Sequence, residues 1–187
     1  MKTEQQYYDE AITIADYMEH MTELKEESQT IYHKFELPTE DNFLTTLSNQ
    51  NWHILVITED WCGDAMLNNA IIRKVAEATN TPMRAVMRDA DTDLIDRYLT
   101  NGGRAIPIYL LLNASGEVVT TWGPRAPELQ QEVVAKRAQL PAQDAPNFKE
   151  AQMALYTAIR DENVVSPQKW QYVYDDFKHV VEKAFTK

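Results

Sequence analysis

Cysteine is scarce in this chain: Cys62 is the only one among 187 residues. A single cysteine cannot form an intramolecular disulfide, so a small exported scaffold held together by crosslinks is excluded. No apolar run reaches the roughly 18 to 20 residues that a membrane-spanning helix requires. The first residues, MKTEQQYYDEA, are polar and acidic where a signal peptide needs a basic start and an apolar stretch. We therefore expect a cytoplasmic protein in a reducing compartment, without membrane contact.

Positive charge, histidine and glycine are also in short supply. The chain has 18 Lys and Arg against 29 Asp and Glu, a formal net charge of −11, so binding to nucleic acid or anionic lipid through a general positive surface is not expected. The four histidines are scattered and match no metal-ligand spacing, which argues against a metal site. The sequence GGR at residues 102–104 lacks the pattern of a nucleotide-binding loop. We predict neither a metal nor another cofactor.

The central part of the chain alternates between strand and helix patterns. Residues 52–58 and 83–87 are short apolar runs rich in β-branched side chains, which is typical of interior strands. Between them, apolar residues recur at three- and four-residue spacing over residues 66–78, which predicts a helix. Two more strands, joined by a tight turn, are predicted at residues 106–112 and 117–122. This alternation predicts an α/β fold, a mixed sheet covered by helices.

Helical patterns flank this central region. Loosely spaced apolar residues from Thr3 to about His33 predict one or two amphipathic helices. Thr39 or Asp41 is the candidate N-cap of a short helix that follows. Further helices are predicted at about residues 92–100, 127–140, 148–162 and 167–185.

Cys62 lies between the end of a predicted strand and the first turn of a predicted helix. Free backbone N–H groups and the positive end of the helix dipole favour a thiolate at this position. The acidic neighbours Glu59, Asp60 and Asp64 favour the protonated thiol instead. The two effects oppose each other, so the sequence leaves the direction of the Cys62 pKa shift open.

The sequence around Cys62 is the first of three short motifs whose order along the chain is informative. WCGDA follows an apolar strand, GGRAIP precedes another about 40 residues later, and a GEV turn comes next. In this order the motifs resemble the thioredoxin family, whose WCxxC opens a helix opposite a cis-proline loop. The likeness covers about residues 40–140 and implies a thioredoxin-like fold with a mixed sheet of four to five strands. We predict a single domain with an N-terminal helical extension, a thioredoxin-like core and a C-terminal helical extension at residues 1–40, 41–140 and 141–187.

The resemblance also assigns roles to individual residues. It makes Cys62 the nucleophile and Pro107 the cis-proline, and it matches Gly123 to a glycine that follows the fourth strand in the family. Backbone atoms of the residue before the proline pair with an extended substrate in such proteins. The resemblance therefore implies substrate contacts on both sides of the nucleophile, at Trp61, Gly63, Asp64, Ile106 and Pro107.

Three positions depart from the family pattern. Ala65 stands where the resolving cysteine would be, Val56 replaces a buried aspartate, and Ala70 replaces a helical proline. Without a second thiol the chain cannot release a mixed disulfide by internal attack. A general protein disulfide reductase is therefore not expected.

Two functions follow from these observations. The first is a monothiol thiol–disulfide oxidoreductase in cell redox homeostasis: Cys62 reacts with a thiol- or disulfide-bearing protein or a low-molecular-weight thiol, and an external thiol resolves the product. Reversible capping of Cys62 in an oxidation sensor is a variant of it. The alternative is a redox-inactive thioredoxin-fold binding module or adaptor.

Structural explanations also exist for single residues. If their roles are purely structural, Cys62 is a small buried side chain and Asp64 caps the helix that follows it. Arg104 either lies in solvent or engages Asp64, Glu59 or an anionic partner.

Overall fold

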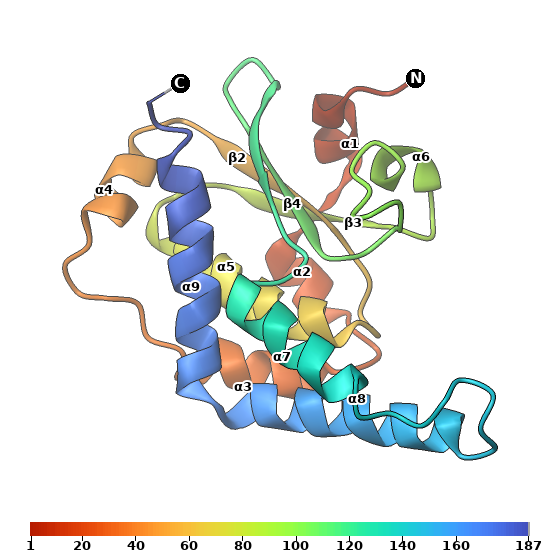
Figure 1. Ribbon diagram of the computed structural model, residues 1–187. Helices are drawn as coiled ribbons and strands as arrows, with labels where there is room; N and C mark the ends of the chain where they lie inside the picture. The colour runs from red at the N-terminus through yellow and green to blue at the C-terminus, as the bar shows by residue number, and fades with distance from the viewer. Residues whose placement is uncertain (187) are drawn as a thin grey trace.

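A five-stranded mixed sheet forms the centre of the computed structural model, which describes residues 1–186 (Figure 1). Its strands are β1 (Ile12–Thr13), β2 (His53–Thr58), β3 (Met83–Met87), β4 (Ile108–Leu112) and β5 (Val118–Trp122). Their order is β1-β3-β2-β4-β5, and only the β2–β3 pair is parallel. The predicted α/β fold and its mixed sheet are confirmed.

Helices cover both faces of this sheet. They are α1 (Glu4–Glu10), α2 (Ile14–Glu19), α3 (Lys25–Lys34), α4 (Asn42–Ser48), α5 (Gly63–Ala78), α6 (Thr92–Ile95), α7 (Pro127–Arg137), α8 (Phe148–Val165) and α9 (Pro167–Glu182). The first face packs against α1 and α6, and the second against α2, α5 and α9 (Figure 1). No helix within residues 1–186 is both long and apolar enough to cross a membrane.

The central strand β2 is continuously apolar because both of its faces are buried. Ile54 and Val56 belong to the core under α5 and α9. Leu55 and Ile57 belong to the core under α1 and α6. Successive side chains of a strand point to opposite faces, so a strand buried on both sides shows no polar alternation. The strand ends at Thr58, so the following loop and Cys62 lie beyond the C-terminal end of this central strand.

The N-terminal segment differs from the prediction of one or two helices. It forms three helices and a two-residue strand, β1, which pairs with β3 through Ile12 and Thr13. Both residues are exposed, so no apolar alternation marks the strand in the sequence. Thr13 also accepts a hydrogen bond from the Asp16 backbone N–H and so caps α2. Helix α6 is likewise shorter than predicted, since it ends at Ile95.

Asp41 joins α4 to the C-terminal helix α9. Its carboxylate accepts hydrogen bonds from Phe43 N at 2.9 Å, Tyr174 Oη at 2.7 Å and Lys178 Nζ at 2.9 Å. Although burial opposes the effect, the bonds from Lys178 and Tyr174 lower the pKa of Asp41. One of the two predicted N-caps, Asp41, thus also holds the C-terminal helix against the core.

Replacing Asp41 with alanine is expected to lower the free energy of unfolding by about 2 kcal/mol, because the helix loses its cap and the buried Tyr174 and partly buried Lys178 lose their acceptor. Urea unfolding followed by circular dichroism measures the change. Glu40→Ala, at the exposed neighbouring position, should change the free energy of unfolding by less than about 0.5 kcal/mol. Equal losses in the two variants would contradict this role of Asp41.

Candidate functional site

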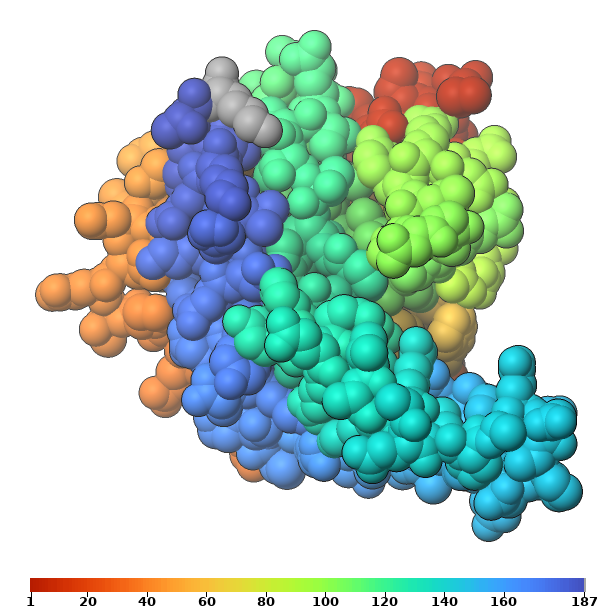
Figure 2. Space-filling view, viewed as in Figure 1, coloured from red at the N-terminus to blue at the C-terminus, as the bar shows by residue number. Residues whose placement is uncertain are grey.

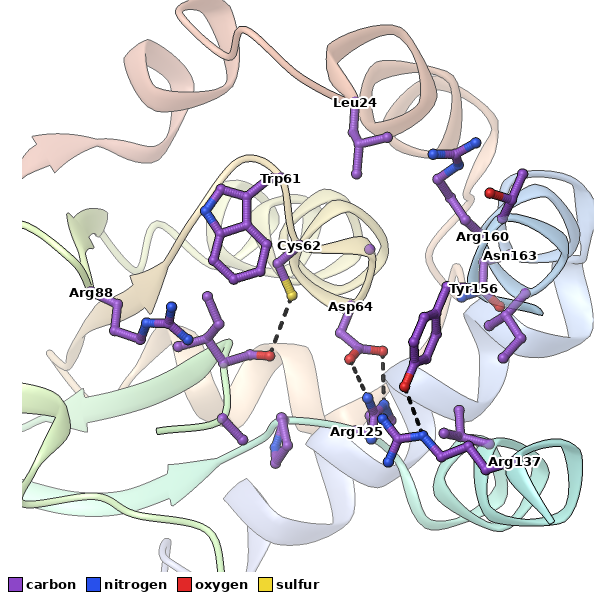
Figure 3. Close-up of a pocket in the computed structure, with 17 residues that line it drawn as sticks. Leu24, Trp61, Cys62, Asp64, Arg88, Arg125, Arg137, Tyr156, Arg160 and Asn163 are labelled. Atoms are coloured by element: carbon purple, nitrogen blue, oxygen red, sulfur yellow. Dashed lines mark hydrogen bonds and ion pairs between the residues drawn. The ribbon is translucent and has the colours of Figure 1, made fainter. Parts of the chain in front are cut away.

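Cys62 lies at the N-cap of α5, next to the loop that precedes β4 (Figure 3). The residue is 9% exposed, and its Sγ donates a hydrogen bond to the Ile106 carbonyl oxygen at 3.5 Å. The Ile106–Pro107 peptide bond is cis. The cis bond implied by the resemblance is confirmed, and the single sulfur faces the proline loop as expected.

The thiol of Cys62 is held in its protonated form. Burial, followed by the negative charge of Asp64, raises its pKa to about 11. The backbone N–H groups at the start of α5 and the Arg125 guanidinium act in the opposite direction but do not prevail. At neutral pH the resting protein therefore carries a thiol. This answers the question that the sequence left open.

Asp64 is part of an ion pair that crosses the site. Arg125 Nε lies 2.9 Å from Asp64 Oδ1, and Arg125 Nη2 lies 2.7 Å from Asp64 Oδ2 (Figure 3). Both side chains are about four-fifths buried, with 18% and 20% of their surface exposed. Burial raises the pKa of Asp64, while Arg125 acts to lower it. The ion pair partly offsets the charge that Asp64 directs at Cys62.

Sequence reasoning missed Arg125 and named Arg104 instead. Arg104 is exposed, as one of its two sequence interpretations holds, and it binds Asp96 through two bonds of 2.6 and 2.9 Å, so the alternative contact with Asp64 or Glu59 is wrong. Arg125 follows β5, sixty-one positions after Asp64. No local spacing connects residues so far apart, and only the folded chain brings them together.

A cavity of about 430 Å³ opens beside the thiol. The predicted nucleophile Cys62 lines it, together with Trp61, Gly63, Asp64 and Ile106, four of the five residues predicted to contact substrate. Pro107 is buried and is not among the lining residues. The structure thus brings together five of the six predicted site residues around one space, although their roles stay predictions.

The far wall of this cavity comes from α7 and α8. Figure 3 shows Arg137, Tyr156, Arg160 and Asn163 on the side opposite Trp61 and Cys62. In Figure 2 the segment that links α7 to α8, together with the start of α8, projects beyond the body of the molecule. The C-terminal helices therefore extend the site, which sequence patterns did not indicate.

Trp61 stands at the rim of the cavity. Its side chain is 47% exposed, and the Arg88 guanidinium lies 5.1 Å from the centre of its ring. Arg88 is held by Asp89 at 2.8 Å and by the Arg104 carbonyl oxygen at 3.0 Å. A cation over an indole face is a favourable contact, so the ring is held at the entrance.

A buried polar network lies on the inner side of α5. Asn69 donates to Thr58 Oγ1 at 3.1 Å and accepts from Tyr109 Oη at 2.6 Å, and Tyr17 Oη lies 3.3 Å from the same Thr58 oxygen. Val56, at the position of the family's buried aspartate, is fully buried in the apolar core. The network contains no carboxylate, so it offers no base to the thiol.

Residues 11–144 match a family model described as thioredoxin. The chain belongs to the thioredoxin family. The match begins about 30 residues before the segment in which the sequence motifs show the likeness, and so includes β1, α2 and α3. No curated protein matches this thioredoxin-family chain.

Two solved structures share the fold along nearly the whole chain. A protein of unknown function from Pseudomonas aeruginosa has a TM-score of 0.66 at 18% identity, and covers 98% of this chain and 99% of its own. An HIV epitope-scaffold has a TM-score of 0.66 at 16% identity, and covers 97% of this chain and 99% of its own. Such low identities show the fold alone. The terminal helices of this thioredoxin-family protein therefore belong to an architecture found elsewhere.

Residues that could hold a metal ion are not gathered in the part of the chain that the structure describes. No three His, Cys, Asp or Glu side chains lie together there with suitable geometry. The groups that could take part in chemistry at this site are therefore the Cys62 thiol, the Asp64–Arg125 ion pair and the other side chains that line the cavity.

Proposed function

We propose that this thioredoxin-family protein carries out monothiol thiol–disulfide exchange, with Cys62 as the nucleophile. The observation that carries the proposal is the position of Cys62 Sγ: it lines the cavity and lies 3.5 Å from the carbonyl oxygen of Ile106. A disulfide bound in this cavity would lie beside Cys62 Sγ. It would also lie beside the backbone of Ile106, the position that resembles the family's substrate-pairing residue. The capacity for covalent chemistry rests on this one sulfur.

The exchange balances without a further oxidant or reductant. Cys62 loses its proton, and the thiolate attacks one sulfur of a disulfide R–S–S–R′. The Cys62–S–S–R bond forms, the S–S bond of the substrate breaks, and R′–S⁻ leaves and takes up a proton. An external thiolate then attacks the mixed disulfide and frees Cys62. Ala65 makes this external step necessary, because no second thiol is present.

The raised pKa makes such a thiol selective. With a pKa of about 11, only about 1 in 10,000 molecules carries the thiolate at pH 7. The thiolate that does form is a stronger nucleophile, but this gain recovers only about half of the loss on a logarithmic scale. Disulfides that do not bind in the cavity therefore react slowly with Cys62. A disulfide that the cavity holds in line with the sulfur gains the advantage of proximity.

The same raised pKa favours a second candidate function, a binding module without redox turnover. In this case the cavity holds a ligand or a peptide segment, and Cys62 serves only as a small buried side chain. Both functions use the same space, so they differ in one observable, a covalent bond to Cys62.

Intact-mass spectrometry after incubation with neutral, cationic and anionic disulfides at pH 8.5 tests the proposal. We expect one adduct per wild-type chain, full reversal by an added small thiol, and no adduct on Cys62→Ser. If none of the disulfides modifies the wild-type protein, thiol–disulfide exchange is rejected in favour of the binding module.

A further inference from the structure

The cavity beside Cys62 is lined by more positive charge than the chain as a whole would suggest. Its lining contains four arginines, Arg88, Arg125, Arg137 and Arg160, and one carboxylate, Asp64. The formal net charge of the whole chain is −11. A cavity lined by one sign of charge concentrates the field of that charge inside it. The positive lining is therefore a local feature that calls for an explanation.

Two of these arginines are neutralised by partners within the protein. Arg125 forms the two-bond ion pair with Asp64, and Arg88 binds Asp89 at 2.8 and 3.2 Å. Their donors already have acceptors, so a ligand gains little by competing for them.

The other two arginines keep donors for a ligand. Arg137 uses its Nε to bind Tyr156 Oη at 2.9 Å, and within residues 1–186 its two Nη atoms have no hydrogen-bond partner. Arg160 contacts Asp161 only at 3.4 and 3.5 Å, and 66% of the Asp161 side chain is exposed to water. Such a long, solvated contact contributes little. Arg137 and Arg160 thus face the cavity with guanidinium groups that are largely unengaged.

Neighbouring residues of α8 add to this site. Tyr156, Arg160 and Asn163 follow one another at helical spacing of four and three residues, so they share one face of the helix. Asn163 is 4% exposed, and its Oδ1, which has no partner among the described residues, can accept a hydrogen bond from a substrate N–H or O–H group but not from the anionic end. Ile159 and Val133 supply apolar surface beside the charges. The wall can accept an apolar chain that ends in an anion.

We propose that this cavity binds the negatively charged end of its substrate, and that the substrates of Cys62 are disulfides that carry a carboxylate or a phosphate. The inference rests on the proposed thiol–disulfide exchange. The planar forks of Arg137 and Arg160 match the oxygens of either anion and form charge-assisted hydrogen bonds with them. Binding at the α7–α8 wall holds the disulfide inside the cavity that Cys62 also lines. Charge at this wall therefore selects the substrate.

Three disulfides with the same S–CH₂–CH₂ frame test this selection. They are 3,3′-dithiodipropionate, which is anionic, bis(2-hydroxyethyl) disulfide, which is neutral, and cystamine, which is cationic. The rate of adduct formation on Cys62 is divided by the rate with a cysteine-containing reference peptide, which removes the intrinsic reactivity of each disulfide. We expect the anionic disulfide to exceed the neutral one by about tenfold, with the cationic one slowest. Coenzyme A disulfide, run in parallel, separates a phosphate preference from a carboxylate preference.

Paired variants show whether the named arginines cause the preference. R137Q/R160Q should reduce the anionic-to-neutral ratio to near one, and 1 M salt should weaken the wild-type preference by screening. The control K149Q/K183Q removes the same charge from two exposed lysines outside the cavity lining and should leave the ratio unchanged. Equal normalised rates for all three disulfides, or an unchanged ratio in R137Q/R160Q, would overturn the inference while exchange itself stands.

A separate binding measurement covers the case in which no disulfide reacts. The Cys62→Ser variant is titrated with 3,3′-dithiodipropionate and followed by amide chemical shifts. Shifts at the cavity that disappear with R137Q/R160Q in the same background support the anion site even if exchange has failed. Absence of any shift rejects the anion site.

Discussion

Alanine in place of Gly123 is expected to lower the free energy of unfolding by about 3 kcal/mol or more. Gly123 has a φ of +121°, a conformation that side chains with a Cβ rarely adopt. A Cβ at this position would lie 2.2 Å from the Pro107 carbonyl oxygen and 3.4 Å from Ile108 Cα. Both neighbours are backbone atoms, so no side-chain rotation relieves the overlap.

The effect of this substitution should reach the site as well. Pro107 follows Ile106, whose carbonyl oxygen accepts the hydrogen bond from Cys62. A displaced proline loop moves this carbonyl, so we expect slower adduct formation in addition to lower stability. Urea unfolding gives the change in stability, and intact-mass spectrometry gives the rate.

Gly63→Ala is the matched control. An added Cβ at Gly63 has no atom within 4 Å, and the residue lies in the first turn of α5, where alanine favours the helix. Its free energy of unfolding should stay within about 1 kcal/mol of the wild-type value. Comparable losses for Gly63→Ala and Gly123→Ala would show that close packing against Pro107 is not the cause.

Asp64→Asn should accelerate the alkylation of Cys62 by iodoacetamide at pH 7 by about tenfold or more. After burial, the charge of Asp64 is the main cause of the raised Cys62 pKa. The amide removes this charge and frees Arg125, which further favours the thiolate. In the wild-type protein the rate should keep rising with pH and level off only above about pH 11, because half of the thiol still carries its proton at that pH. In the variant this plateau should begin at lower pH.

Asp60→Asn provides a control with the same change of charge two residues from the thiol. The carboxylate of Asp60 accepts hydrogen bonds from the Thr22 backbone N–H at 2.8 Å and from its hydroxyl at 2.9 Å, away from the cavity lining. Its alkylation rate at pH 7 should stay close to that of the wild type. An Asp64→Asn variant that is folded by circular dichroism but keeps the wild-type pH profile would contradict the role given to Asp64.

The parts of the fold that the sequence predicts are those with a local pattern. Strand β2 shows as an apolar run because it is buried on both faces, and α5 and α9 show as apolar residues at three- and four-residue spacing. Strand β1 leaves no such pattern, because its two residues are exposed and are held only by pairing with β3. The spacing of apolar residues reflects which side chains are buried, so it cannot reveal an element whose side chains are exposed.

The sequence by itself determined that this chain has a thioredoxin-like α/β fold and that its single thiol stands at a strand-to-helix junction. It also determined that the chain has no second thiol. Only the tertiary structure decided the protonation of Cys62, through burial and Asp64, and the identity of the wall that faces it. Arg125 and the arginines of α7 and α8, Arg137 and Arg160, line the same cavity as Cys62 although they follow it by 63 to 98 positions in the sequence. The physical reason is that charge and burial act through space, and no local spacing records which distant side chains will share a cavity.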